Sequence, residues 1–124
     1  MATPVDDRRE TASLIGSDKV EGTAVYGPDG SRIGSVQRVM LDKISGKVAY
    51  AVVSFGGFLG IGEDYYPLPW NTLKYDTNLG GYRANVTADQ LTGAPKYARN
   101  QDWDWSDRTA DRRVYEYYKE PLWY

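Results

Sequence analysis

The sequence predicts an all-β protein: a small six-stranded antiparallel barrel followed by a C-terminal helical extension rich in aromatic residues. Three observations support this fold class. Valine, isoleucine and glycine are concentrated in residues 21–93, where turn signals recur at short intervals. One segment of this zone, KVAYAVVSF, is apolar at both parities, which is typical of a strand with both faces covered. Residues 94–124 hold eight of the chain's seventeen aromatic residues.

The first expected element is a hairpin over residues 22–41. Pro28 presets φ for the first turn position, and Gly30 can adopt a positive φ. The strand that follows does not alternate cleanly, because Ile33 and Val36 differ in parity. A bulge near Gly34 explains this slip. A second turn at residues 44–47 then leads into KVAYAVVSF.

Three further strands complete the barrel. One is expected around residues 64–68, and two more, 73–75 and 82–86, flank a turn at residues 78–81. Thr87 then predicts the N-cap of a short helix with the sequence ADQL. Six short strands joined by tight turns favour a small antiparallel barrel or sandwich, because closure removes exposed edges.

The extension is expected to contain one helix, over about residues 107–119. Ser106 predicts its N-cap, and Asp107 complements the positive end of the helix dipole. One face of this helix is apolar and consists of Ala110, Val114, Tyr117 and Tyr118. The opposite face is charged and consists of Arg108, Asp111, Arg112 and Glu116.

At 124 residues the chain is expected to form one domain with additional arms. We expect a flexible N-terminal arm over residues 1–12, the barrel over 13–93 and the extension over 94–124.

Composition excludes several classes of function. The sequence has no histidine and no cysteine, so triad catalysis, thiol chemistry and ordinary zinc sites are excluded. A net charge of −2 argues against nucleic acid as a general partner. No segment is apolar over the roughly twenty residues that cross a bilayer, and the N-terminus has no signal-peptide pattern. We therefore expect a cytoplasmic protein with no cofactor and no transmembrane segment.

The segment GGFLGIGEDYYPLPW, residues 56–70, has the strongest compositional bias. Its glycines do not follow the order of a dinucleotide-binding fingerprint, and no Walker lysine follows them. They predict a tight connection between strands. Phe58, Leu59 and Ile61 would lie at its tip as a contact surface. Further structural turn and corner residues are Gly30, Gly34, Gly60, Gly62, Pro69 and Trp70.

Carboxylates cluster at two places in the sequence. Glu63 and Asp64 are adjacent, so their side chains would diverge in a strand, and solvated acids are the better interpretation. The run that starts at Asp102 resembles a calcium loop, but Asp107 and Arg113 occupy the positions that need glycine and glutamate. We predict no catalytic residue and no metal site.

The aromatic residues of the extension predict burial against another surface. Disordered tails are poor in aromatic residues, whereas interface cores are rich in them. Two partners for these rings stay open at this point: the chain's own barrel and a second subunit. Stacking on bases is less favoured, because the extension has balanced charge. The predicted contact residues here are Trp103, Trp105, Tyr117, Tyr118 and Trp123.

An ordered set of motifs across residues 13–93 resembles one known family, the PRC-barrel domains, named after the H subunit of the photosynthetic reaction centre. The motifs are Leu14-Ile15-Gly16, Asp29-Gly30, Ile33-Gly34-Ser35-Val36, Gly46-Lys47-Val48-Ala49-Tyr50, Gly56 to Gly62, and Pro69-Trp70. The resemblance implies an SH3-like, partly open barrel without enzymatic activity. Known members serve as accessory or interaction modules, among them a ribosome maturation factor with a companion domain that is missing here.

The function expected from these observations is a non-enzymatic module of protein–protein contact, forming a homodimer with an unknown further partner. A small barrel with a limited core and an aromatic arm motivates the dimer. The alternative is an RNA- or ribosome-associated accessory factor, by analogy with the maturation factor. An enzyme or a small-ligand carrier is the third class, and no residue cluster supports it.

Overall fold

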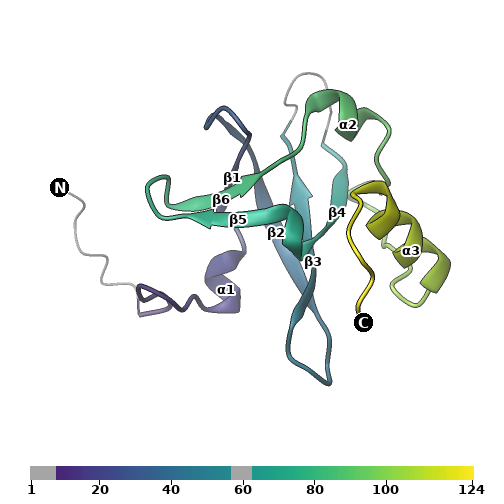
Figure 1. Cartoon of the computed structure of the whole chain (residues 1–124), viewed down its shortest axis with the longest axis horizontal. Helices are drawn as coiled ribbons and strands as arrows, with labels where there is room; N and C mark the ends of the chain where they lie inside the picture. Colours follow the sequence, from purple (N-terminus) through teal and green to yellow (C-terminus); the bar gives the residue numbers. More distant parts are fainter. Residues whose placement is uncertain (1–7, 57–62) are drawn as a thin grey trace.

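The computed structural model describes residues 8–56 and 63–124. This part of the chain is mostly β, with six strands, three helices and one 3-10 turn (Figure 1). The strands are β1 (Ala24–Tyr26), β2 (Arg32–Leu41), β3 (Val48–Ser54), β4 (Tyr65–Pro69), β5 (Leu73–Asp76) and β6 (Gly81–Ala84). The remaining elements are α1 (Ser17–Val20), η2 (Trp70–Thr72), α2 (Ala88–Thr92) and α3 (Arg108–Tyr117).

The six strands form one curled, half-barrel sheet in the order β4-β3-β2-β1-β6-β5 (Figure 1). The predicted strand number is confirmed. Four neighbouring pairs are antiparallel, but β1 and β6 run parallel, so the expectation of a wholly antiparallel barrel is wrong at this pair. A tight hairpin turn enforces antiparallel pairing, whereas β1 and β6 are connected only through the four strands between them. The SH3-like detail stays a prediction.

The β1–β2 hairpin has the predicted turn and bulge. Gly30 has a φ of +84° at the turn. The register shifts between Val25 and Tyr26, and Val25 lies opposite Gly34. Gly34 also lies directly against β3, because a Cβ at this position would overlap the main-chain oxygen of Ser54. Only glycine permits the two strands to approach this closely.

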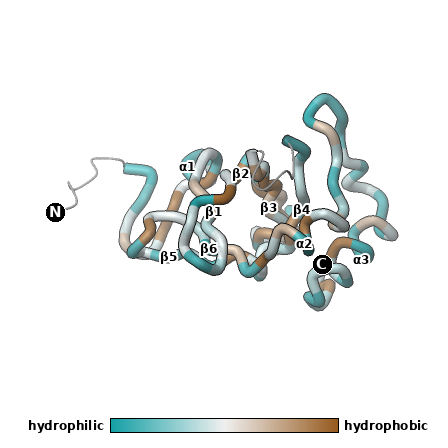
Figure 2. Tube along the Cα trace, turned by 90° about the horizontal axis from the view of Figure 1, so that it is seen from above, coloured by the Kyte–Doolittle hydropathy of each residue, from teal (hydrophilic) through white to brown (hydrophobic). Residues whose placement is uncertain are grey.

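Strand β3 is buried on both faces, as its apolar sequence predicts. Val53 and Phe55, which directly follows the strand, have one parity, Tyr50 and Val52 have the other, and each of the four is at most 2% exposed. The ring of Phe55 packs edge-on against Tyr66 of β4, with 5.3 Å between centroids. Figure 2 shows the hydrophobic residues concentrated around β2, β3 and β4. Other parts of the protein therefore pack against both faces of β3.

The predicted corner after β4 forms a turn of 3-10 helix. Leu68 is fully buried, Pro69 ends β4, and Trp70 begins η2. The Trp70 ring is half-buried and lies 5.2 Å from that of Tyr82 on β6. The corner therefore joins the two halves of the sheet. The predicted loop residues Phe58, Leu59, Gly60, Ile61 and Gly62 lie outside the described residues.

The chain after β6 returns to the opposite edge of the sheet. Helix α2 is capped as predicted, since the hydroxyl of Thr87 accepts a hydrogen bond from the main-chain N–H of Gln90 (3.1 Å). Tyr97 then exchanges two main-chain hydrogen bonds with Tyr65 of β4, at 2.8 and 2.9 Å. Helix α3 follows beside β4 (Figure 1). The extension thus covers the edge that β4 would otherwise leave unpaired.

Helix α3 begins one residue later than the sequence predicts. Its N-cap is Asp107, whose carboxylate accepts hydrogen bonds from the N–H groups of Thr109 (3.0 Å) and Ala110 (3.2 Å). The prediction of Ser106 as the cap is wrong. Its N–H and hydroxyl both donate to Asp104, which forms a turn just before the helix. The carboxylate of Asp107 also suits the positive end of the helix dipole.

Candidate functional site: the C-terminal clamp and the hairpin groove

The outer face of β3 is covered by aromatic rings of the extension. The ring of Tyr50, on β3, lies 5.3 Å from Trp105, 5.4 Å from Tyr115 and 5.7 Å from Tyr124. The hydroxyl of Tyr115 donates to the main-chain oxygen of Ala49 (2.7 Å). The aromatic extension therefore packs on its own barrel and supplies the second layer over β3.

A buried carboxylate lies at the centre of these rings. Asp111 is 1% exposed. One of its oxygens accepts a hydrogen bond from the hydroxyl of Tyr50 (2.8 Å), and the other accepts one from the guanidinium of Arg108 (2.8 Å). The hydroxyl of Tyr124 in turn donates to that of Tyr50 (2.6 Å). Sheet, helix and C-terminal segment are thus joined by one polar network.

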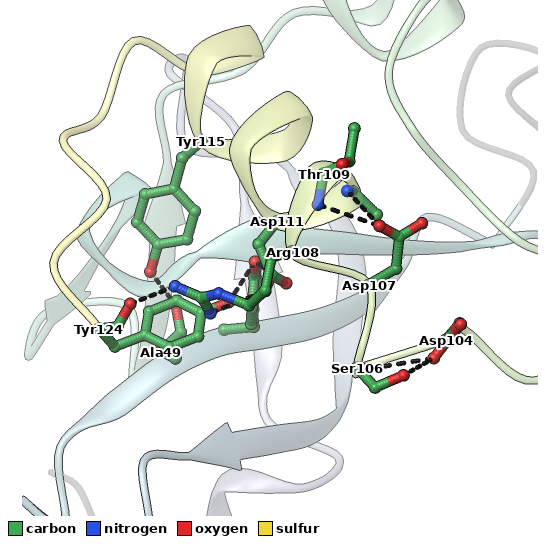
Figure 3. A network of polar contacts seen from close by, with 11 residues as sticks. Ala49, Asp104, Ser106, Asp107, Arg108, Thr109, Asp111, Tyr115 and Tyr124 are labelled. Atoms are coloured by element: carbon green, nitrogen blue, oxygen red, sulfur yellow. Dashed lines mark hydrogen bonds and ion pairs between the residues drawn. The ribbon is translucent and has the colours of Figure 1, made fainter.

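Arg108 connects the helix to Tyr124. Its guanidinium donates to the main-chain oxygen of Tyr124 and stacks over the Tyr124 ring, 4.6 Å from the centroid (Figure 3). We call Tyr50, Arg108, Asp111 and Tyr115 the C-terminal clamp, and Tyr124 is the residue that it holds. The clamp residues come from β3 and from α3, and Tyr124 comes from the segment after α3.

The polar groups of the clamp have a structural role. Burial, followed by the hydrogen bonds to Tyr124 and Asp111, raises the pKa of the Tyr50 hydroxyl far above its ordinary value. Both oxygens of Asp111 accept hydrogen bonds from within the protein. A general base needs an atom that can approach a substrate proton. The clamp offers no such atom and holds the extension on the sheet instead.

The helix pattern predicts Asp111 on the charged, outward face, and this prediction is wrong because Asp111 is buried. The signal was available, because Asp111, Val114, Tyr115 and Tyr118 follow the i, i+3, i+4, i+7 spacing of one helix face. A carboxylate among aromatic residues on an apolar face indicates a buried, partnered acid.

A groove with apolar rims lies beside the clamp, between the β2–β3 hairpin and the end of the chain. We call it the hairpin groove. It has a volume of about 580 Å³ and is lined by Gly46, Lys47, Val48, Trp70, Asn71, Pro121 and Trp123. Of its lining residues, Trp123 is 40% exposed. Two large apolar side chains of the β2–β3 hairpin are also exposed, Ile44 by 95% and Leu41 by 52%. Leu41 lies directly opposite Val48, so both side chains project from the same face of the hairpin.

The five predicted contact residues of the extension have different environments. Trp103, Trp105 and Tyr117 are half-buried against the core, and Tyr118 is buried. Trp123 is the exposed member of this set. The other three predicted contact residues, Phe58, Leu59 and Ile61, lie outside the described residues.

The adjacent acids after the glycine-rich loop form ion pairs with the extension. Asp64 lies 3.2 Å from Lys96, and Glu63 lies 3.4 Å from Arg99. The two pairs are largely exposed, so water screens them and each contributes little to stability. They join the same two parts of the chain as the clamp does.

The described ranges, 8–56 and 63–124, contain no helix with the length and apolar character needed to cross a membrane. They also contain no group of three or more acidic, histidine or cysteine side chains that could hold a metal ion.

The curled sheet, the glycine-dependent contact of β2 with β3 and the tryptophan corner define a small β-barrel module. The family model of the PRC-barrel domain matches residues 14–91, more than half of the chain, and the chain belongs to this family. The family resemblance drawn from the sequence motifs is confirmed. An uncharacterised protein of Deinococcus radiodurans is 27% identical over 93 residues. That match covers 75% of this chain and 33% of the relative, so the chain spans about a third of the relative's length.

Proposed function

We propose that this chain is a non-enzymatic accessory module that acts through protein–protein contacts and forms a homodimer. One observation carries the proposal: Trp123, which lines the hairpin groove, is exposed, and so are Ile44 and Leu41 of the hairpin that borders the groove. Exposed apolar patches on soluble domains mark surfaces of interaction. Tryptophan is also enriched among the residues that dominate binding energy.

The contrast with the rest of the extension supports this assignment. The rings of Tyr50, Tyr115 and Tyr124 pack against one another, whereas the neighbouring Trp123 is exposed. Ile44 is at the tip of a β-hairpin, where a turn needs no apolar side chain for its own stability. These side chains therefore serve a contact outside the monomer.

The ionisable groups support a role without catalysis. Hydrogen bonds from Ser31, Ser45 and Ser106 lower the pKa values of Asp29, Asp42 and Asp104, in that order. A carboxyl group that acts as a general acid near neutral pH needs a raised pKa. Here the shifts come from turn geometry, and the whole sequence has no histidine or cysteine.

Sedimentation velocity across a concentration series tests the proposal. The wild type is expected to dimerise at high micromolar concentration, and the change of Ile44 to serine is expected to weaken the dimer. Leu14→Ser is the matched control, because Leu14 is 71% exposed but belongs to the N-terminal segment and does not line the groove. A wild type that stays strictly monomeric would remove the homodimer. Equal effects of the two changes would remove the groove as its interface.

A further inference from the structure

The segment after α3, residues 119–124, is an extended strap. Helix α3 ends in a Schellman motif: the N–H of Lys119 donates to Glu116 (3.0 Å) and that of Glu120 donates to Tyr115 (2.9 Å). This motif requires a left-handed residue, and that residue is Lys119, with a φ of +57°. Among the described residues, Lys119 is the only non-glycine residue with a positive φ. The start of the strap is therefore strained, because a side chain with a Cβ disfavours this conformation.

The strap is anchored at its other end. Leu122 and Tyr124 are half-buried against the core, whereas Pro121 and Trp123 alternate with them and are exposed. Tyr124 brings its ring, its hydroxyl and its main-chain oxygen to the clamp. On the side away from the clamp, Pro121 and Trp123 border the hairpin groove. The strap is thus a short segment that starts at a strained residue, Lys119, and is held at Tyr124 by specific contacts with the clamp.

We propose that two copies of this chain exchange their straps, so that Tyr124 of each copy docks in the clamp of the other. This inference rests on the self-association put forward above and specifies its geometry. An exchanged strap makes the same clamp contacts as a strap folded back on its own chain. The equilibrium between the monomer and the exchanged dimer therefore depends on the two features that differ: the conformation of the hinge at Lys119 and the new surface between the copies.

Both differences favour exchange. Extension of the chain at Lys119 relieves the left-handed conformation, and short strained hinges promote exchange of segments between copies. Pro121 and Trp123 of the strap line the hairpin groove, so a second copy that receives the strap is brought to this groove and to the exposed Ile44 and Leu41 of the same hairpin. Burial of these side chains adds apolar contact that the monomer lacks.

Substitutions at the hinge test the strain directly. Lys119→Gly removes the cost of the left-handed conformation in the monomer. We therefore expect this change to raise the dissociation constant of the dimer roughly tenfold for each of the two hinges. Lys119→Val raises that cost and is expected to strengthen the dimer. Sedimentation velocity measures both dissociation constants against that of the wild type. Equal dissociation constants for the three proteins overturn the exchange.

Mixing two defective proteins tests whether the strap is shared. Tyr124→Ala removes the docking residue but leaves the clamp, and Arg108→Ala damages the clamp but leaves Tyr124. Arg108 is 46% exposed, so its replacement leaves a side-chain site that water can reach, and circular dichroism checks that both variants fold. Each variant alone is expected to dimerise poorly. Their mixture is expected to form heterodimers, because one complete Tyr124–clamp contact is then available between the two chains.

The outcomes separate this inference from the proposed function. Dimers that form in the wild type but show no recovery on mixing overturn the exchange and leave the homodimer standing. A monomeric wild type removes the homodimer. In that case a Lys119→Val protein that dimerises supports the exchange, and one that stays monomeric overturns it.

Discussion

Replacement of Asp111 by alanine gives the sharpest test of the clamp. The carboxylate is 1% exposed and accepts hydrogen bonds from Tyr50 and Arg108, each at 2.8 Å. Without it, the buried hydroxyl of Tyr50 loses its acceptor and Arg108 loses its counter-charge. The extension then keeps its aromatic contacts with the sheet but lacks the polar network that fixes them.

The magnitude follows from these two contacts. A hydrogen bond to a charged group is worth about 1.5–3 kcal/mol, and breaking a buried ion pair costs about 3–5 kcal/mol. Arg108 is 46% exposed and regains water, so we expect the lower end, about 3 kcal/mol, for Asp111→Ala. Asp111→Asn keeps an acceptor oxygen for Tyr50 and should cost about 1–2 kcal/mol.

Chemical unfolding followed by two probes measures both effects. Tryptophan fluorescence reports mainly on the extension, which holds Trp103, Trp105 and Trp123, whereas far-ultraviolet circular dichroism reports on the whole chain. Separate transitions for the two probes in Asp111→Ala would mean that the extension detaches before the barrel unfolds. Arg112→Ala, on the exposed side of the same helix, is the control and should change stability by less than about 0.5 kcal/mol. A loss below about 1 kcal/mol for Asp111→Ala would refute the reasoning.

Three further predictions concern local features. Gly34→Ala should cost about 2 kcal/mol or more in urea unfolding, because the added methyl would overlap the main chain of β3, and a neutral result would mean that the two strands separate freely. Asp107→Ala should cost about 1 kcal/mol and Ser106→Ala less, since only Asp107 caps α3; equal costs would contradict the assigned cap. Burial raises the pKa of Tyr115 to about 12 from its ordinary value near 10. Its contribution to stability is therefore complete below pH 10 and is lost as pH rises toward 12, which tyrosinate absorbance and unfolding at each pH would detect, with Tyr115→Phe showing a smaller alkaline loss.

Much of the barrel could be predicted because its determinants are local. The turn at Gly30, the bulge beside Gly34 and the cap at Thr87 each depend on residues close in sequence. The double burial of β3 followed from a run that is apolar at both parities. The ordered motifs also carried the family assignment, which the match over residues 14–91 bears out.

The candidate site was predicted less well because its members are far apart in sequence. Tyr50 and Asp111 are separated by 61 residues, and no periodicity of the chain pairs them. The helix pattern placed Tyr118 on the apolar face correctly but assigned Asp111 to the solvent side. An acid is assigned to solvent by default, and only the arrival of Tyr50 and Arg108 as partners makes its burial favourable.

The sequence by itself determined the strands, the turns between them and the aromatic character of the extension, because alternation, glycine and capping act over a few residues. Tertiary structure alone decided the parallel pairing of β1 with β6, since no short turn sets their direction. It also decided which surface of the barrel the aromatic residues of the extension cover. The rings of Trp105, Tyr115 and Tyr124 needed an apolar surface, and the outer face of β3 is the one that a buried carboxylate and an arginine fasten them to.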